Sequence, residues 1–271
     1  MIRIIFSDID GTLINDDLVV TENTKQSLIK AREQGSLIVP VSARMPKAIR
    51  PILNSFMMDF PIISYNGALI IDEKGQELES HSMKKGSAIE ICRFIMATKE
   101  VVWNVYSGDS WYSQSRNNPW IQREERIVGL SSEEASLFEI ENLSEIHKLL
   151  LMGDSVKILE IETKLKNDYP YLSISKSSPH YLEVMANGIH KGEAVSFLAA
   201  YYGVNIKDTI AFGDNFNDLD MLLTVGQGFV MANGPEIVQQ RVGQTTTDNN
   251  HDGIAHVLNR YFNGDEPFKV D

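Results

Sequence analysis

The sequence predicts an α/β protein with a parallel-sheet core and an inserted α+β domain, and three observations support this. Short strands that are apolar throughout alternate with amphipathic helices in the first and last thirds of the chain, which indicates a parallel sheet covered on both faces. Polarity alternates more visibly in between, as is typical of antiparallel strands. At 271 residues the chain is long enough for two domains with separate cores. We therefore expect a discontinuous core of residues 1–81 plus 184–271 and an inserted domain of residues 82–183.

Turn and capping signals place the elements of the first core segment. An Asp-Gly pair at residues 10 and 11 ends an apolar strand. Thr21 is suited to the N-cap of a helix that ends at Gly35, and Pro46 is suited to the first turn of the next helix. The expected strands are 2–7, 36–41 and 61–64, and the expected helices are 22–34 and one that begins near residue 46.

The same signals place the remaining elements. In the second core segment we expect helices 191–202, 217–223 and 251–262 and strands 209–212 and 228–231. In the inserted domain we expect a first helix, strands 101–106 and 110–113, two further helices, and strands 156–161 and 171–175.

The composition excludes several classes of protein. The chain has 25 Lys and Arg residues against 37 Asp and Glu residues, a formal net charge of −12. This argues against nucleic acid or an anionic membrane surface as a partner, because both favour basic patches. The single cysteine, Cys92, excludes a disulfide framework within the chain and is expected in the core.

The N-terminus lacks a signal-peptide pattern, and no apolar run approaches the roughly 20 residues of a membrane span. We expect a cytoplasmic protein that is a monomer or a weak homo-oligomer.

Two carboxylates follow the first strand, in the segment Ser7-Asp8-Ile9-Asp10-Gly11-Thr12. Ligands of open α/β sheets bind at the carboxyl ends of the strands. A turn at Gly11 would let Asp8 and Asp10 converge there, where a hard cation could hold them. The alternative is an ordinary Asp-Gly turn after a strand.

A second group of oxygen ligands, Gly213-Asp214-Asn215-Phe216-Asn217-Asp218, follows an apolar strand in the last third. Mg²⁺ prefers one or two carboxylates and retains several waters, so this segment could supply its ligands. The alternative is a polar loop that caps the next helix.

Two further residues could hold an anion. Lys191 stands at the start of a helix, where the dipole disfavours a cation, and a helix N-terminus with an ammonium group makes an anion site. Ser42, in Val41-Ser42-Ala43-Arg44, follows the second strand, and its hydroxyl and the adjacent backbone N–H groups could hold a phosphate. Without the acidic segments, Lys191 would be interpreted as an ordinary surface lysine. The short segment around Ser42 is, by itself, weak evidence for a phosphate site.

In this order, the four motifs resemble those of the haloacid dehalogenase superfamily, and most closely its Cof-type phosphatases, which carry a large α/β cap. Tyr65-Asn66-Gly67-Ala68 is similar to the Asn-Gly-Ala segment that precedes the cap in that family. The resemblance covers essentially the whole chain and implies a Rossmann-like core with the inserted domain as its cap. One segment departs, because the family usually has Thr-Gly-Arg where this chain has Ser42-Ala43-Arg44. Serine keeps the hydroxyl, but alanine tolerates a positive φ poorly.

The resemblance implies a Mg²⁺-dependent phosphatase that hydrolyses small phosphorylated metabolites, with sugar phosphates favoured. Asp8 would be the nucleophile that forms an aspartyl-phosphate, and Asp10 would be the general acid and base. A carboxylate can approach a dianionic phosphate ester only where cations offset the repulsion, so a metal ion is a requirement of this chemistry.

The resemblance also implies which residues hold the phosphate and the metal. The phosphate oxygens would be bound by Ser42, Lys191 and Asn217. Mg²⁺ would bind the carboxylates of Asp8 and Asp214 and the backbone carbonyl of Asp10, and Asp218 would support those ligands.

Two alternative functions stay open. A phosphomutase or other phosphotransferase would share the aspartyl-phosphate and pass the group to a sugar hydroxyl instead of water. A non-catalytic phosphate-binding module or a phospho-accepting receiver would also use Asp, Ser or Thr, and Lys at strand ends. A receiver is a short single domain, however, and a silent module would be expected to lose one of the motif residues.

The inserted domain offers weaker candidates for substrate contact. Its aromatic side chains would line either a substrate pocket or the core: Trp103, Tyr106, Trp111, Tyr112 and Trp120. Arg116 and Asn117, in an expected loop, could reach a polar substrate.

Overall fold

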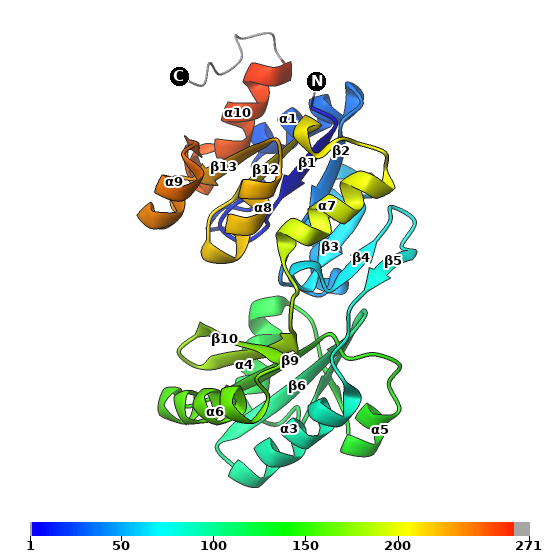
Figure 1. Ribbon diagram of the computed structural model, residues 1–271, viewed down its shortest axis with the longest axis vertical. Coiled ribbons are helices and arrows are strands. Elements are labelled where there is room, and N and C mark those ends of the chain that lie inside the picture. Colours follow the sequence, from blue (N-terminus) through cyan, green and yellow to red (C-terminus); the bar gives the residue numbers. More distant parts are fainter. Residues whose placement is uncertain (1, 263–271) are drawn as a thin grey trace. The chain divides into compact units, whose positions relative to one another are not determined.

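The computed structural model describes residues 2–262, which form two compact units with separate sheets (Figure 1). The core unit consists of residues 2–44, 49–79 and 190–262, and the cap unit consists of residues 45–48 and 80–189. The predicted α/β class is confirmed. The chain leaves the cap unit a few residues later than the sequence predicts, because the last cap strand extends to Ala186.

The core unit follows the predicted alternation of strands and helices, with one exception. Its elements, in chain order, are β1 (Ile4–Ser7), α1 (Glu22–Glu33), β2 (Leu37–Pro40), α2 (Pro46–Leu53), η1 (Asn54–Phe56), β3 (Ile62–Ser64), η2 (Tyr65–Gly67), β4 (Leu69–Ile71), β5 (Glu77–Ser80), α7 (Lys191–Tyr201), η3 (Ile206–Asp208), β12 (Thr209–Gly213), η4 (Phe216–Asp218), α8 (Leu219–Thr224), β13 (Gln227–Met231), α9 (Glu236–Val242), β14 (Thr245–Thr246), η5 (Asn249–His251) and α10 (Gly253–Phe262). Two of them, α2 and β5, cross the boundary between the units. The exception to the alternation is at β3, β4 and β5, which form a separate three-stranded sheet in which β3 and β4 are antiparallel.

The core sheet brings the two predicted acidic segments to one edge. Its strand order is β14-β13-β12-β1-β2, and every neighbouring pair is parallel. Ser7 of β1 lies opposite Phe212 of β12, and the backbone N–H of Asp8 donates to the Phe212 carbonyl. Because the carboxyl ends of parallel strands share an edge, the residues after β1 and β12 meet there.

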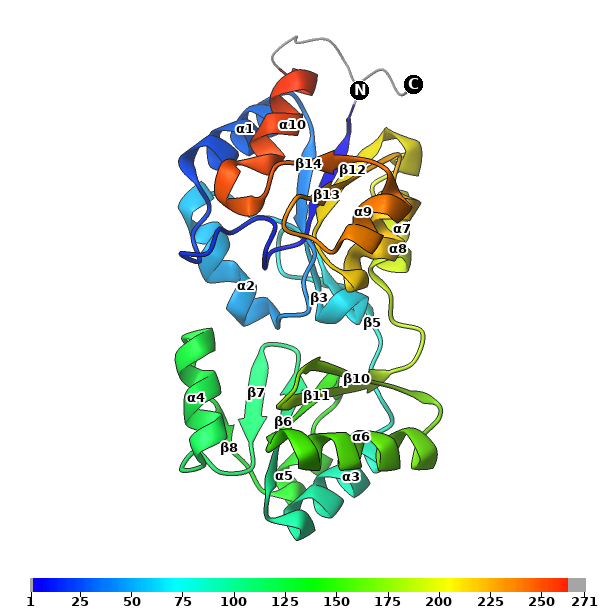
Figure 2. The same ribbon diagram turned by 90° about the vertical axis from the view of Figure 1, so that its left-hand side faces the viewer.

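Helices cover both faces of this sheet, as the apolar strands predict. Helices α1 and α10 pack side by side on one face, and α7 and α8 lie on the other (Figure 2). β1 and β12 are buried along their whole length. From α7, Val195 and Leu198 pack into one hydrophobic cluster with Phe6 and Ala211 of the sheet. This packing fixes the start of α7, where Lys191 stands, against the edge that carries the acidic residues.

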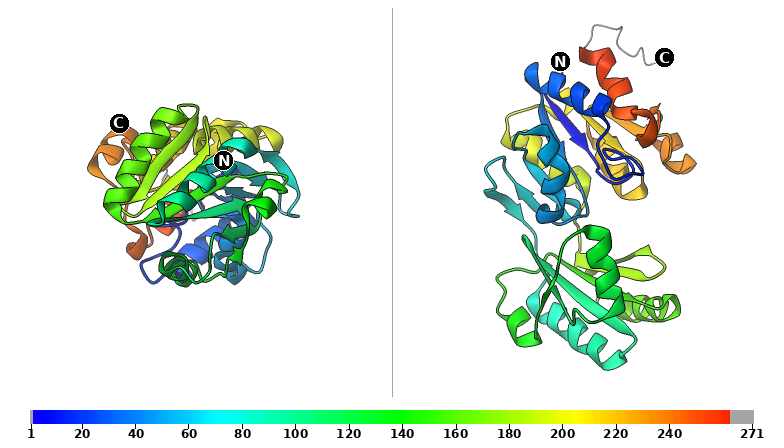
Figure 3. Two further views of the ribbon diagram at one scale, coloured as in Figure 1. Left: turned by 90° about the horizontal axis from the view of Figure 1, so that it is seen from below. Right: turned by 180° about the vertical axis from the view of Figure 1, so that it is seen from behind.

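The cap unit contains a six-stranded sheet with helices packed against it (Figure 3). Its elements are α3 (Lys85–Thr98), β6 (Val101–Ser107), β7 (Ser110–Ser113), α4 (Pro119–Val128), β8 (Glu133–Glu134), α5 (Leu137–Glu141), β9 (Lys148–Gly153), α6 (Ser155–Asp168), β10 (Leu172–Ser178) and β11 (Tyr181–Ala186). The strand order is β10-β11-β9-β6-β7-β8, and all pairs are antiparallel except β7 with β8. Side chains of α3 and α6 share one hydrophobic core with β6, β9 and β11. The predicted antiparallel character of this domain is confirmed.

One predicted cap strand is wrong. Residues 156–161 lie in helix α6, and strand β9 precedes them. The Asp154 side chain caps the helix by accepting a backbone N–H of its first turn. The buried positions of α6 are Ile158, Ile161 and Leu165, and their spacing follows one face of a helix. The apolar run of β9 does not alternate, and such a run alone does not distinguish a buried strand from a helix.

Cys92 lies in α3 and is fully buried. Burial raises the pKa of its thiol, so the side chain is a protonated core residue, as expected. None of the helices in residues 2–262 has both the length and the apolar character that a membrane span requires.

Candidate active site

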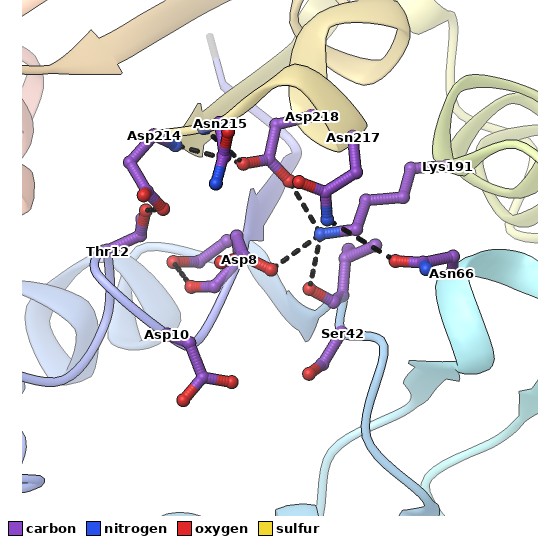
Figure 4. Close-up of polar contacts among 12 residues, drawn as sticks. Asp8, Asp10, Thr12, Ser42, Asn66, Lys191, Asp214, Asn215, Asn217 and Asp218 are labelled. Carbon is purple, nitrogen blue, oxygen red and sulfur yellow. Dashed lines mark hydrogen bonds and ion pairs between the residues drawn. The ribbon is translucent and has the colours of Figure 1, made fainter. Parts of the chain in front are cut away.

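Three charged side chains meet at the carboxyl edge of the core sheet (Figure 4). Asp8 follows β1, Lys191 begins α7 and Asp218 ends η4. The Lys191 Nζ lies 2.5 Å from Asp8 Oδ1 and 2.6 Å from Asp218 Oδ1. Their exposed fractions are 6% for Asp8, 1% for Lys191 and 0% for Asp218. Since isolated buried charges are costly, this ammonium holds two carboxylates that would otherwise be uncompensated.

The charges of this site are unbalanced. Burial opposes the charged form of Lys191, but attraction to Asp8 and Asp218 dominates and raises the pKa of the ammonium. Burial and the Asp218 charge raise the pKa of the Asp8 carboxyl well above its usual range, although Lys191 opposes this. Burial, and next the Asp218 charge, raise the pKa of Asp214 to about 6. The site therefore holds more negative charge than Lys191 neutralises, which favours a bound cation.

Thr12 orients the carboxylate of Asp214. The Thr12 hydroxyl donates to Asp214 Oδ1 at 2.8 Å. Gly11 lets the loop pass close by, because it has a φ of +76° and an added Cβ would lie 2.7 Å from Asp214 Oδ2. A side chain at residue 11 would thus be strained and would displace the Asp214 carboxylate.

The donor set fits a hard divalent cation. Carboxylate oxygens of Asp8, Asp214 and Asp218 lie within 4.8 Å of one another. Both oxygens of Asp218 are engaged, Oδ1 with Lys191 and Oδ2 with the backbone N–H groups of Asp214 and Asn215. Within residues 2–262, Asp8 Oδ2 and Asp214 Oδ2 accept no hydrogen bond. Two oxygens of the all-oxygen ligand type that Mg²⁺ prefers are thus available, with Asp218 as their support.

Asp10 points to a different partner. Its carboxylate is not part of the three-carboxylate cluster; it accepts the Nε–H and Nη2–H groups of Arg44 at 2.8 Å and 2.6 Å. We expect Asp10 to contribute its backbone carbonyl, and not its carboxylate, to cation binding. Its side chain is 52% exposed, so the carboxylate remains open to an approaching molecule.

Ser42 and Asn217 lie near Lys191 but differ in burial. Ser42 is 1% exposed, and its Oγ accepts the Arg44 backbone N–H at 3.1 Å. Because that contact uses the oxygen as acceptor, the hydroxyl hydrogen is free to donate. Asn217 is exposed, and its Nδ2 lies 3.5 Å from Asn66 Oδ1. Asn66 also donates its backbone N–H to the Ser42 carbonyl, so the Asn-Gly-Ala segment contacts two of the three expected phosphate ligands, Ser42 and Asn217.

The N-terminus of α7 is held by another helix. His190 makes no capping hydrogen bond with its side chain; instead, Asp220 Oδ2 accepts the backbone N–H of Gly192 at 2.8 Å. The helices approach closely there, since a Cβ on Gly192 would lie 2.9 Å from the Thr224 hydroxyl. Asp220 and Gly192 thereby fix the position of Lys191.

The sequence did not reveal these supporting contacts. The side-chain roles of Arg44, Thr12 and Asp220 depend on partners far away in the chain, although Arg44 and Thr12 stand inside motifs that the sequence does single out. A polar side chain within two residues of a predicted site residue is the one signal that could have found them.

The aromatic cap residues are mostly structural. The buried ones are Trp103, Tyr106 and Trp111, and Tyr112 and Trp120 are partly buried. The Trp111 indole donates to Asn104 inside the sheet. Arg116 and Asn117 are exposed, and Arg116 pairs with Glu125 at 3.1 Å.

Replacing Thr12 by valine should weaken cation binding. The substitution preserves the shape but removes the hydroxyl that holds Asp214 Oδ1, and loss of a contact to a metal ligand typically costs about 10-fold in affinity or more. We expect Thr12→Val to raise the Mg²⁺ dissociation constant about 10-fold in a calorimetric titration. Thr12→Ser keeps the hydroxyl and serves as the control. Equal affinities in the three proteins would contradict this role of Thr12.

Comparisons with known proteins show what this chain is similar to. A family model described as haloacid dehalogenase-like hydrolase matches residues 5–258. A Haemophilus influenzae protein named "Putative phosphatase" is 33% identical, over 97% of this chain and 99% of its own. A Bacillus subtilis protein named as a 5-amino-6-(5-phospho-D-ribitylamino)uracil phosphatase is 25% identical, over 95% of this chain and 97% of its own.

The fold has a similar counterpart among solved structures. The crystal structure of a haloacid dehalogenase-like hydrolase from Bacteroides thetaiotaomicron matches with a TM-score of 0.88 at 27% identity. The match covers 97% of this chain and 100% of that one. The chain therefore belongs to the haloacid dehalogenase-like hydrolases, as its motifs imply, and it is an enzyme of their phosphatase type.

Proposed function

We propose that this chain is a Mg²⁺-dependent phosphatase that hydrolyses phosphate monoesters of small metabolites through an aspartyl-phosphate on Asp8. One observation carries the proposal: the Asp8 carboxylate stands at the end of β1, 2.5 Å from a buried lysine, within a cluster of three carboxylates. A nucleophile, a fixed cation and a set of metal ligands are thus together at the edge where α/β sheets bind ligands.

The reaction consists of two displacements at phosphorus. In the first, an Asp8 carboxylate oxygen attacks phosphorus, the bond to the ester oxygen breaks, and Asp10 gives its proton to the departing alcohol. In the second, water attacks the aspartyl-phosphate, the bond between phosphorus and the Asp8 oxygen breaks, and Asp10 takes a proton from the water. Inorganic phosphate leaves, and Asp8 and Asp10 return to their starting states.

Preset donors hold the transferring phosphoryl group. The Lys191 ammonium is fixed by two carboxylates, the Ser42 hydroxyl hydrogen is free to donate, and the Asn217 amide is exposed. Donors whose positions are fixed before the reaction stabilise the developing charge at little reorganisation cost, and most phosphoryl-transfer catalysis is of this kind.

The metal ligands are assigned from the free oxygens of the site. Asp8 Oδ2, Asp214 Oδ2 and the backbone carbonyl of Asp10 would hold Mg²⁺. When bound, the ion supplies positive charge that offsets the repulsion between Asp8 and a dianionic phosphate ester.

Sugar phosphates and related polyol phosphates are the favoured substrates. The Bacillus subtilis relative is named for a phosphate ester on a ribityl chain. The protein environment supports a small substrate of this type, because the half-exposed Asp10 side chain and the partly buried Arg44 guanidinium add polar groups beside the nucleophile. Such groups suit a hydroxylated leaving group better than an apolar one.

A phosphate-release screen tests the proposal. The purified chain, freed of metal with EDTA, is offered p-nitrophenyl phosphate and a panel of sugar, polyol and nucleotide phosphates, with and without added MgCl₂. We expect release only with Mg²⁺, at the highest kcat/KM for a sugar or polyol phosphate. Added acceptor sugars should leave phosphate release unchanged, whereas a phosphotransferase would divert the group to them. Full activity in EDTA, or no activity on any ester, would overturn the proposal.

A further inference from the structure

Arg44 forms a two-point ion pair with the proposed acid and base. Its Nε–H donates to Asp10 Oδ2 and its Nη2–H to Asp10 Oδ1, at 2.8 Å and 2.6 Å. Paired hydrogen bonds of this type fix the plane of a carboxylate as well as its position. Within residues 2–262, the Asp10 carboxylate accepts no other hydrogen bond, and its side chain is 52% exposed. Arg44 is therefore what keeps this carboxylate from rotating freely in solvent.

The backbone of Arg44 is itself anchored. Its N–H donates to Ser42 Oγ at 3.1 Å. Its carbonyl accepts the Ser64 hydroxyl at 2.6 Å and the Tyr65 N–H at 3.2 Å. Tyr65 is fully buried, with a φ of +51° that a non-glycine residue rarely adopts. Backbone strain of this kind persists only where the surroundings enforce it, and it is common at functional sites.

We propose that Arg44 is a positioning residue that directs the Asp10 carboxyl group, which carries the proton in this step, at the leaving-group oxygen during the first displacement. This inference rests on the proposed function and adds a residue to its mechanism. In that step the proton moves from Asp10 to the ester oxygen as the bond from that oxygen to phosphorus breaks, and Arg44 transfers nothing. General acid catalysis of this type requires the proton donor within hydrogen-bond reach of the departing atom.

The geometry favours this role over direct phosphate binding. The two donors that Arg44 presents to Asp10 are already committed, whereas Lys191 supplies the fixed cation beside Asp8. Only arginine has the planar, two-point donor geometry. Lysine at this position would keep the positive charge, but it would not fix the orientation of the Asp10 carboxyl group.

A matched pair of substrates separates the two roles. p-Nitrophenyl phosphate has a good leaving group that needs little proton donation, whereas phenyl phosphate has nearly the same shape and a poorer leaving group. If Arg44 aims Asp10, kcat/KM for phenyl phosphate should fall about 10-fold more than for p-nitrophenyl phosphate in Arg44→Met, a modest part of the effect of a general acid. Arg44→Lys should show the same selective loss. Equal losses on both substrates would overturn the proposal, because a phosphate ligand or a purely structural residue would affect both alike.

A double-mutant cycle gives a second, independent readout. If Arg44 acts through Asp10, adding Arg44→Met to Asp10→Asn should change kcat/KM for phenyl phosphate less than about 2-fold, because the carboxyl group that Arg44 positions is already absent. A further 10-fold loss would show direct action on the substrate and would contradict the role assigned here. Thermal denaturation of all variants confirms that they are folded, and Arg44→Lys replaces Arg44→Met in the cycle if the latter does not fold.

The failure of this inference differs from that of the proposed function. If the wild-type chain releases no phosphate from either aryl ester with Mg²⁺, the proposed function fails and Arg44 loses its role with it. If the wild type is active and the Arg44 variants lose both activities equally, the phosphatase assignment stands and only the role of Arg44 is wrong.

Discussion

Asp8→Asn is expected to lower phosphate release by at least about 1,000-fold, because the amide cannot act as the nucleophile that the mechanism requires. Asparagine has nearly the same shape, so the contacts around it should persist. The measurement is release from p-nitrophenyl phosphate and from the best substrate of the panel, in saturating Mg²⁺.

The stability of Asp8→Asn should distinguish lost chemistry from lost fold. The folded protein raises the pKa of Asp8, so the ionised carboxylate is less favourable there than in the unfolded chain. Such a group contributes most stability below its unfolded pKa and loses that contribution as pH rises through the folded pKa. At pH 7 in EDTA, the neutral amide should therefore be at least as stable as wild type, measured by thermal denaturation.

Asp17→Asn is the matched control for this substitution. Asp17 lies in the exposed loop after β1, and the same chemical change there should leave activity within about 2-fold, as for most surface substitutions. Residual activity of Asp8→Asn above a tenth of wild type would exclude Asp8 as nucleophile.

The common edge of the main site residues could be predicted from the sequence because a parallel sheet constrains it. Asp8 and Asp214 each follow an apolar strand, and parallel strands end at one edge. The pairing of β1 with β12, which brings the two residues close together along that edge, is visible only in the structure. Lys191 could be expected there because a lysine at a helix start runs against the helix dipole.

The supporting contacts could not be predicted, because no regular feature of the fold constrains them. Arg44 with Asp10, and Thr12 with Asp214, are pairings of side chains that only the folded backbone brings together, and no periodicity encodes them. Cap helix α6 was mistaken for a strand because a short apolar stretch fits both periods, and only the Asp154 cap and the buried face distinguish them. Sequence patterns thus predict which residues lie at a sheet edge or on a buried helix face, but they do not predict which side chains contact one another.

Lys191→Met is expected to abolish activity and also to destabilise the fold, which sets it apart from Asp8→Asn. The substitution removes the ammonium that lies between Asp8 and Asp218. Breaking a buried ion pair by removal of one partner typically costs about 3–5 kcal/mol, because the remaining charge is left uncompensated. We expect a loss of this size in the free energy of unfolding, measured by urea denaturation at pH 7 in EDTA.

Two further measurements show whether this loss has an electrostatic origin. If uncompensated carboxylates cause it, Mg²⁺ should recover part of the stability of Lys191→Met, because a bound cation replaces some of the missing positive charge. Adding Asp218→Asn should also recover part of it, because this removes one of the two stranded carboxylates. Neither treatment should restore activity, since neither returns the phosphate-binding ammonium. A stability loss that is unchanged in both cases would mean that Lys191 supports the fold through the packing of its methylene chain, and the electrostatic account of the site would then be wrong.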